Sequence, residues 1–234
     1  MKFIKFYNLF LIVIYLSSCS IVFKKMDTNK INQITINNQT WMNSNLNTTS
    51  FRNGDIIHEA KTNKEWDSLN NLQEPAWCYY NNIFSSDSKY GKLYNWYAIN
   101  DKRNIAPIGW HIPTKKDWLI LFNNIADTTI YSETKFGTTF YGNILNTKMK
   151  STNGWAYNSH GDNESGFTAL PAGIRWSSDS FSNLGTHSLW WCSSVSNYKD
   201  DGKYFAYGIF LTLDNCGISS YPKSNGLSIR CIKD

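Results

Sequence analysis

The feature that most constrains the fold of this chain is a tryptophan-rich stretch at residues 94–118. It places Trp96, Trp110 and Trp118 within twenty-five residues, and Pro107 and Gly109 interrupt it. Aromatic side chains have large apolar surfaces, roughly 150–250 Å² each, and they dominate the packing of the interiors that contain them. The stretch therefore predicts a hub in the protein interior at which several elements of the chain meet.

The composition predicts one domain with an aromatic core. The chain has 234 residues, of which 41% are hydrophobic, so one domain of about 200 residues is expected. A chain of this size buries roughly 70% of its extended surface on folding. Aromatic residues make up 16% of the chain and ten residues are tryptophan. Because aliphatic residues are correspondingly sparse, we expect a core of rings and short strands.

The charge distribution argues against nucleic-acid binding. The formal net charge is +5, and removal of an amino-terminal signal that contains Lys2 and Lys5 would leave +3. The remaining basic residues are scattered among acidic ones and form no run of five or more. A nucleic-acid-binding protein is expected to carry a clustered basic face, so no nucleic-acid partner is predicted.

The amino terminus has the pattern of a secretory signal. Lys2 and Lys5 precede an apolar run at residues 9–16. This run is too short to cross a bilayer, because a membrane-spanning helix needs about 20 apolar residues. A short basic region followed by such a run is typical of a cleaved signal peptide.

The end of this signal is similar to a bacterial lipobox. Residues 16–19 read Leu-Ser-Ser-Cys, and in a lipobox the cysteine, here Cys19, is diacylated and becomes the first residue. The alternative is an ordinary secretory signal with a chance cysteine. We expect residues 1–19 to be a lipoprotein signal peptide and residues 20–32 a tether of roughly 20 Å. The membrane is then a partner through the lipid anchor. If the source is Gram-negative, the absence of Asp after Cys19 leads us to expect an outer-membrane location.

Two segments predict amphipathic helices. In residues 62–71, Thr62 or Asn63 can cap the helix and Glu65 lies in its first turn. A second helix is predicted to begin after Thr114, with Asp117 three residues later. Its apolar residues recur at the spacing i, i+3, i+4 and i+7: Trp118, Leu121, Phe122 and Ile125. A third, shorter helix is expected at residues 141–149.

Strand patterns dominate the second half of the chain. An Asn-Asn turn is expected between early strands at residues 34–36 and 41–42. Runs of aromatic and β-branched residues at 189–192 and 204–213 predict strands, and alternation at 227–232 predicts a terminal strand. Short helices in the first half and twisted antiparallel strands in the second indicate an α+β fold.

Six segments of the chain resemble a known bacterial family. They are QTWMNSNL (39–46), PAWCYYNN (75–82), YGKLYNWYAIND (90–101), GWHIPTKKDW (109–118), NESGFTALPAGIR (163–175) and SNGLSIRCIKD (224–234). In this order they resemble the Fibrobacter succinogenes major paralogous domain, a family of secreted proteins and lipoproteins. The resemblance implies one such domain at residues 33–234 in an exported protein. It implies no particular reaction.

A more distant likeness suggests the type of fold. The segment GWHIPTKKDW, together with a terminal GLSIRC strand, is similar to the C-type-lectin-like fold, which includes the formylglycine-generating enzymes. The resemblance implies a single C-type-lectin-like α+β domain whose late strand closes beside the amino-terminal strand. Because one fold hosts many functions, this likeness does not decide the function.

Four cysteines remain after Cys19, and an exported protein would meet an oxidising compartment in which pairing is the default. Four cysteines allow three connectivities. The fold resemblance favours a bond from Cys78 to Cys231, and then a bond between Cys192 and Cys216 across neighbouring strands. The alternative for Cys192 and Cys216 is a pair of reduced core residues. No CxxC motif is present, so a thioredoxin-like motif and a cysteine zinc site are not predicted.

No catalytic or metal motif stands out. The chain has four histidines but no HExxH and no GxSxG motif, and we expect His111, between Trp110 and Ile112, to be a satisfied core histidine. Oxygen-bearing side chains at residues 162–164 could attract calcium. We expect instead that Asn163 and Glu164 brace a loop by hydrogen bonding. No metal and no cofactor is predicted.

The candidate ligand surface is the irregular stretch at residues 151–183. Aromatic rings beside polar groups suit sugars, because a ring face packs on apolar C–H groups while polar side chains bind hydroxyls. The alternative is that the tryptophans are core residues. The candidate residues are Trp155, Tyr157, Asp162, Arg175 and Trp176, with His160 and Asp179 beside them.

The sequence therefore predicts an exported, lipid-anchored protein of the cell envelope with a non-catalytic binding module. A glycan or another envelope protein is the expected partner. The first alternative is an enzyme of the formylglycine-generating type, for which Cys192 and Cys216 would be the available reactive pair. The second alternative is a purely structural envelope protein.

Overall fold

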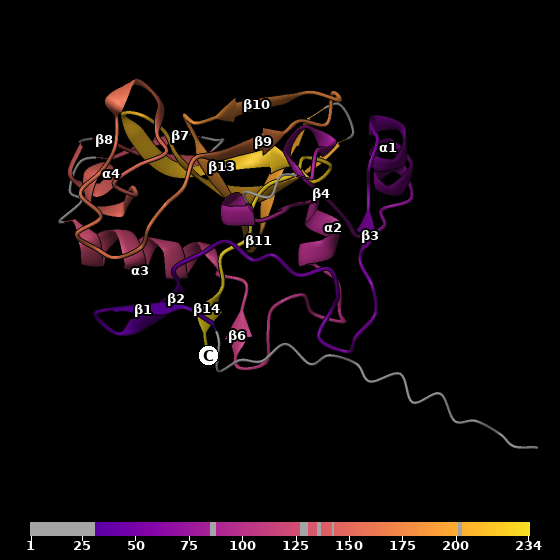
Figure 1. Ribbon diagram of the computed structural model, residues 1–234, viewed down its shortest axis with the longest axis horizontal. Helices are drawn as coiled ribbons and strands as arrows, with labels where there is room; N and C mark the ends of the chain where they lie inside the picture. The colour runs from indigo at the N-terminus through magenta and orange to yellow at the C-terminus, as the bar shows by residue number, and fades with distance from the viewer. Residues whose placement is uncertain (1–30, 85–87, 127–130, 135–136, 142, 201–202) are drawn as a thin grey trace, which may run out of the picture.

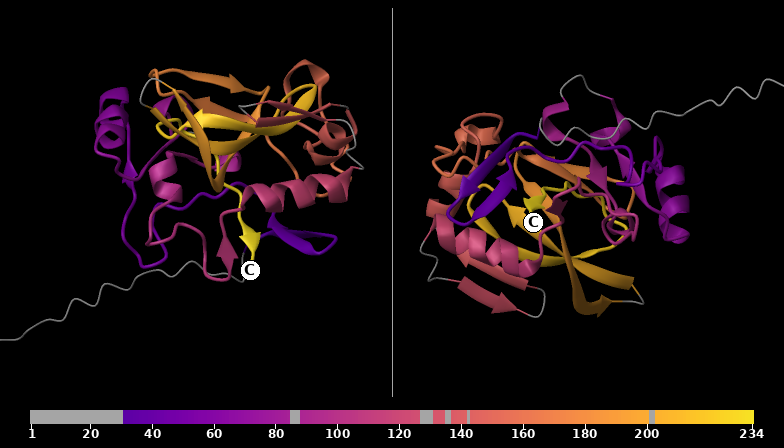
Figure 2. Two further views of the ribbon diagram at one scale, coloured as in Figure 1. Left: turned by 180° about the vertical axis from the view of Figure 1, so that it is seen from behind. Right: turned by 90° about the horizontal axis from the view of Figure 1, so that it is seen from below.

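The structure is a computed structural model that describes residues 31–84, 88–126, 131–134, 137–141, 143–200 and 203–234. It combines mostly antiparallel sheets with a few short helices, as the α+β prediction requires. The predicted signal peptide, including Cys19, and all but the last two residues of the predicted tether lie outside the described residues. Figures 1 and 2 show α3 between the five-stranded sheet above it and the four-stranded sheet below it.

The four-stranded sheet joins the two ends of the domain. Its order is β1 (Gln33–Ile36), β2 (Gln39–Met42), β14 (Ile232–Lys233) and β6 (Trp110–His111). The predicted early hairpin is confirmed, and Asn37 adopts a φ of 51° in its turn. Ile232 pairs with Trp41 on one side and with His111 on the other.

The five-stranded sheet separates two hydrophobic clusters. Its order is β11 (Ser188–Asp200), β12 (Lys203–Leu211), β13 (Asn215–Pro222), β8 (Gly137–Tyr141) and β7 (Tyr131–Thr134), and every pair is antiparallel. Successive side chains of a strand point to opposite faces. The neighbours Trp190 and Trp191 therefore enter different clusters, and both are fully buried.

Two small sheets complete the strands. The hairpin of β9 (Ala172–Arg175) and β10 (Phe181–Leu184) lies over the large sheet (Figure 1). The other sheet contains β3 (His58–Glu59), β4 (Ala76–Cys78) and β5 (Leu93–Tyr94), in which β3 and β4 are parallel.

The predicted helices form where their local signals lie. Thr62 caps α1 (Asn63–Asn71) and Thr114 caps α3 (Lys115–Ile125). In return, the backbone N–H of each threonine donates to the carboxylate of the acidic residue three positions later. The four predicted apolar residues of α3 are buried. Among the described residues, the remaining helices are α2 (Trp96–Ile99), α4 (Asn143–Met149), and 3-10 turns at Tyr80–Asn82, Ser88–Tyr90 and Ala156–Asn158.

Two expectations need correction. Trp96, Trp110 and Trp118 are all buried, but they do not form one hub: Trp118 belongs to one cluster, and Trp96 and Trp110 belong to the other.

The terminal strand predicted at residues 227–232 is a regular strand only at its end. Before that, Leu227 and Ser228 bridge to Tyr94 and Trp190. This segment alternates because it is buried between several partners, not because it continues one sheet.

A buried polar network fastens this closing segment to the rest of the domain. Arg230 is fully buried, and its guanidinium donates to Asn45 Oδ1 at 3.0 Å and to the backbone oxygen of Phe167. Asn45 Oδ1 also accepts from Trp190 Nε1 at 2.8 Å, while its Nδ2 donates to the Tyr90 oxygen at 2.8 Å. Four segments far apart in sequence therefore meet at one carboxamide.

Candidate functional site

The candidate site is an open pocket of about 240 Å³ between the β9–β10 hairpin and the large sheet. It combines aromatic rings with polar groups that come from four strands and the turns beside them. Its lining residues are Trp176, Asn183, His187, Leu189, Phe210, Thr212, Ser219 and Tyr221.

Two glycines lie against aromatic rings that line this pocket. A Cβ atom on Gly208 would lie 2.8 Å from the ring of Tyr221, and one on Gly217 would lie 2.8 Å from the ring of Phe210. Such separations are shorter than van der Waals contact. Glycine at these two positions therefore lets both rings lie close against the strands.

Several polar groups of the pocket remain available to a ligand. Within the described part of the chain, the hydroxyls of Tyr221 and Ser219 and the side-chain amide of Asn183 form no hydrogen bond. His187 Nδ1 lies 2.9 Å from Thr186 Oγ1. Burial lowers the pKa of His187, which favours the neutral ring, and burial raises the pKa of Tyr221, which keeps its hydroxyl protonated. The pocket thus offers neutral donors and acceptors beside aromatic rings.

The predicted ligand surface does not form as one face. Trp155 is only 3% exposed, and its Nε1 donates to the Ala169 oxygen at 3.0 Å, so the core alternative is correct for this residue. Tyr157 is 84% exposed, and Asp162 is also exposed. Of the five predicted residues, Trp176 alone lines the pocket, and its Nε1 donates to Ser182 Oγ at 2.7 Å.

Arg175, the fifth predicted surface residue, is a fully buried structural group. Its guanidinium lies 4.6 Å from the ring centroid of Trp66 and 4.7 Å from that of Phe181. Nη1 donates to Asn82 Oδ1 at 2.8 Å and Nη2 donates to Asn63 Oδ1 at 2.9 Å. The side chain therefore joins α1 to the β9–β10 hairpin and is closed to a ligand. His160 and Asp179 are exposed and lie outside the pocket lining.

Comparison with known families shows the family to which this domain belongs. The family model of the Fibrobacter succinogenes major domain matches residues 34–233 of the chain. The chain belongs to the Fibrobacter succinogenes major domain family. The match covers all the described strands and helices except the outermost residue of β1, and it confirms the resemblance seen in the sequence. No curated protein and no solved structure shows significant similarity to the chain.

In this Fibrobacter succinogenes major domain, neither predicted disulfide is present. All four described cysteines carry free, buried thiols. Cys192 lies on β11 and Cys216 on β13, but β12 separates these strands. Adjacent strands are about 4.8 Å apart, so two steps exceed the roughly 7 Å limit between the Cα atoms of a disulfide. Cys78 and Cys231 belong to different hydrophobic clusters.

The four buried thiols of this domain are also unreactive. Burial raises the pKa of Cys78 and of Cys216 to about 12 and raises that of Cys192 and Cys231 as well. Because the thiolate is the nucleophile and the metal ligand, such cysteines react slowly. Cys192 and Cys216 are therefore neither adjacent nor activated, and the reactive pair of the enzyme alternative is not formed.

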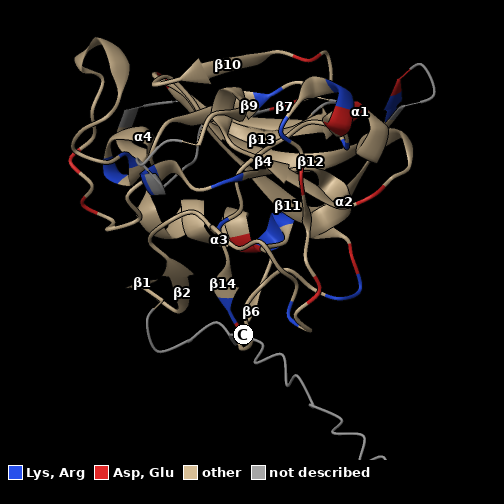
Figure 3. Ribbon diagram, turned by 45° about the vertical axis from the view of Figure 1, so that its right-hand side comes forward, with Lys and Arg blue, Asp and Glu red and all other residues tan. Residues whose placement is uncertain are grey.

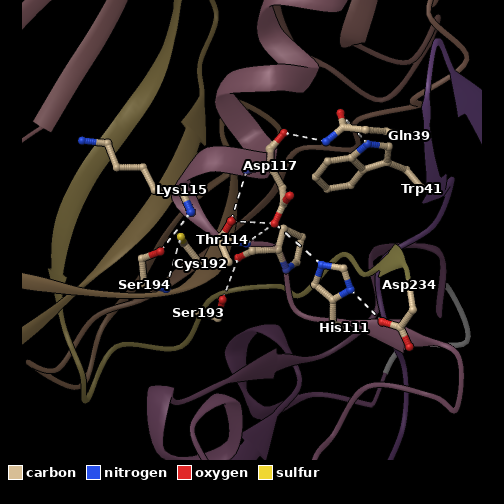
Figure 4. A network of polar contacts seen from close by, with 11 residues as sticks. Gln39, Trp41, His111, Thr114, Lys115, Asp117, Cys192, Ser193, Ser194 and Asp234 are labelled. Atoms are coloured by element: carbon tan, nitrogen blue, oxygen red, sulfur yellow. Dashed lines mark hydrogen bonds and ion pairs between the residues drawn. The ribbon is translucent and has the colours of Figure 1, made fainter.

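His111 is not the core histidine that the sequence predicts. Its side chain is 41% exposed, and it lies beside the amino-terminal end of α3 (Figure 4). Nδ1 is 2.8 Å from Asp234 Oδ1, and Nε2 is 3.7 Å from Asp117 Oδ2. The Thr114 hydroxyl lies 2.6 Å from the same Asp117 oxygen. The histidine thus lies between Asp117 in α3 and Asp234, the residue that follows β14, and the Thr114 hydroxyl donates to the Asp117 carboxylate.

The loop at residues 162–164 is braced by hydrogen bonds, as predicted. Asn163 Oδ1 accepts from the Thr168 backbone at 2.7 Å, and Nδ2 donates to Thr168 Oγ1 at 3.0 Å. Glu164 forms a 3.2 Å ion pair with Lys148. Among the described residues, no group of three His, Cys, Asp or Glu side chains is arranged to hold a metal ion.

The free state of the cysteines gives a direct prediction. In protein denatured without reductant, alkylation should label Cys78, Cys192, Cys216 and Cys231, because no bond protects them. In the folded protein the same reagent should react slowly, since the thiols are buried and protonated. Peptide mapping by mass spectrometry measures both reactions. Any disulfide-linked peptide pair among these four residues would contradict the structure.

Proposed function

We propose that the protein is an exported, lipid-anchored component of the cell envelope whose domain binds a glycan without catalysis. The observation that carries the proposal is the pocket beneath the β9–β10 hairpin. It joins the rings of Trp176, Phe210 and Tyr221 to the polar groups of Asn183 and Ser219. Sugars present apolar C–H faces and hydroxyl edges, and this combination of groups complements both.

The size of the pocket limits the ligand. Pockets for drug-sized molecules measure roughly 300–1,000 Å³, whereas this pocket measures about 240 Å³ and is open to solvent. A single sugar ring, or the end of a longer glycan chain, therefore fits the proposal better than a ligand enclosed within the domain. Neutral lining groups favour an uncharged sugar.

The location follows from the amino terminus. The basic residues, the short apolar run and the Leu-Ser-Ser-Cys sequence at residues 16–19 support export and diacylation of Cys19. Two acyl chains anchor a protein stably, whereas one does not. No helix among the described residues is long and apolar enough to cross a bilayer. We place the protein at the outer membrane, with its domain held near the lipid surface by residues 20–32.

A C-type-lectin-like arrangement of the domain is part of this proposal. The pairing of Trp41 in β2 with Ile232 in β14 brings an early strand beside the closing strand, as that fold requires. We propose no nucleic-acid partner, and Figure 3 shows Lys and Arg segments interspersed with Asp and Glu segments along the ribbon.

The first test is glycan binding. The domain at residues 31–234 should bind envelope glycans in a glycan and peptidoglycan screen. Trp176→Ala should lower the affinity for the glycan that binds most tightly at least tenfold, about 1.4 kcal/mol in binding free energy. Tyr221→Phe removes only a hydroxyl and should also weaken binding. Calorimetric titration measures the affinities, and melting curves confirm that the variants fold.

Tyr157→Ala is the matched control, because Tyr157 is exposed but lies outside the pocket lining. It should leave binding unchanged. Glycan affinity that is equal in the wild type and both pocket variants would exclude this pocket. Absence of any glycan ligand would favour a purely structural envelope protein.

The second test concerns the anchor. Wild-type protein should partition into the detergent phase, because the acyl chains of Cys19 supply buried methylene groups. Cys19→Ala should move the protein into the aqueous phase, whereas Cys78→Ala, which removes a different cysteine, should not. Equal partitioning of Cys19→Ala and the wild type would show that the protein is anchored in another way.

A further inference from the structure

A buried lysine lies against an asparagine side chain on the β3–β4–β5 sheet, away from the pocket. Lys92 directly precedes β5 and is only 3% exposed. Its Nζ lies 4.7 Å from the ring centroid of Trp77 and 5.1 Å from that of Tyr79. The same nitrogen contacts Asn47 Oδ1 and lies 3.3 Å from the Asn47 backbone oxygen. The amine therefore contacts the oxygen atom that is bonded to the side-chain carbonyl carbon of Asn47.

Burial of this amine increases the share of its neutral, nucleophilic form. Burial lowers the pKa of Lys92, and the carboxylate of Glu59 opposes only part of this effect. A desolvated lysine is a better nucleophile than an exposed one, because more of it is unprotonated at neutral pH. No carboxylate forms an ion pair with Lys92 among the residues that the structure describes.

Glu59 is a carboxylate whose charge acts on Lys92 without an ion pair between them, and its Oε2 lies 4.0 Å from Lys61 Nζ. Glu59 lies on β3 directly beside Trp77 on β4, and its charge acts on both Lys92 and Tyr79. Asn47 itself is exposed, so a group released from its side chain can leave into solvent. The site thus joins a desolvated amine, a carboxamide and a neighbouring carboxylate.

We propose that Lys92 and Asn47 form an intramolecular isopeptide bond. The lone pair of neutral Lys92 Nζ attacks Asn47 Cγ, and a carbon–nitrogen bond forms. Glu59 accepts a proton from Nζ and passes it to Asn47 Nδ2. The Cγ–Nδ2 bond then breaks and ammonia leaves, so one amide replaces another and no oxidant or reductant is required.

The bond would fasten the segment before β3 to the strand β5. It would close a loop between residues 47 and 92 that contains all of α1 and β4. Cross-links of this kind restrict the unfolded chain and therefore resist unfolding. A covalent tie would suit a small sheet whose strands are only two or three residues long.

Peptide mapping of the full-length protein, extracted in detergent, tests the proposal. Trypsin should release the peptide at residues 31–52 joined to the peptide at residues 90–102, because modified Lys92 is not cleaved. The joined peptide should be lighter than the sum of its parts by one ammonia molecule. Recovery of residues 31–52 and 90–92 only as separate, unmodified peptides would overturn the proposal.

Three variants and an internal control sharpen this test. Lys92→Arg and Asn47→Ala should each remove the joined peptide, and Glu59→Gln should reduce its yield at least tenfold. An unchanged yield in Glu59→Gln would overturn the role given to Glu59.

Lys150 is the internal control. It is also buried beneath a ring, that of Trp155, but its Nζ donates to the backbone oxygen of Leu213. Trypsin should cleave after Lys150 in every sample, and a joined peptide there would show a reaction that is not specific to Asn47.

Discussion

The fold depends on how a buried positive charge is held without an acidic partner. Within the described residues Arg230 forms no ion pair, and burial lowers the pKa of its guanidinium. Arginine nevertheless stays protonated in proteins, so its charge must be stabilised by dipoles and ring faces. The Asn45 side chain, the oxygens of Phe167 and Thr168, and the ring of Phe167 at 4.4 Å supply this environment. Loss of any of these hydrogen bonds leaves buried polar groups unpaired.

This network also explains why the two hydrophobic clusters form one domain. Asn45 accepts from Trp190, whose ring stacks 5.6 Å from that of Trp118 in one cluster. The adjacent Trp191 enters the other cluster and donates to the Tyr94 oxygen at 2.7 Å. Tyr94 in turn pairs with Leu227, three residues before Arg230. The large sheet, the small β3–β4–β5 sheet and the closing segment therefore fix one another, and the pocket forms on the sheet that they hold.

The parts of the fold that local sequence determines could be predicted. Thr114 and Asp117 cap α3 through contacts three residues apart, and the early hairpin needs only its Asn turn. The pocket could not be predicted, because Trp176, His187 and Tyr221 come together only through the order of strands. Its clearest local signal, glycine at 208 and 217, has meaning only when the facing rings are known. The disulfide prediction failed for the same reason, since nothing local places β12 between Cys192 and Cys216.

Urea unfolding of Asn45→Ala tests most directly whether this network holds the domain together. The substitution leaves Trp190 Nε1, one Arg230 nitrogen and the Tyr90 oxygen without the partner that Asn45 provides. Buried unpaired groups cost about 1–3 kcal/mol each, so we expect a loss of about 3 kcal/mol or more in the free energy of unfolding. Asn71→Ala, at the exposed end of α1, should stay within about 0.5 kcal/mol of the wild type. If Asn45→Ala were as stable as Asn71→Ala, the fold would not depend on this network.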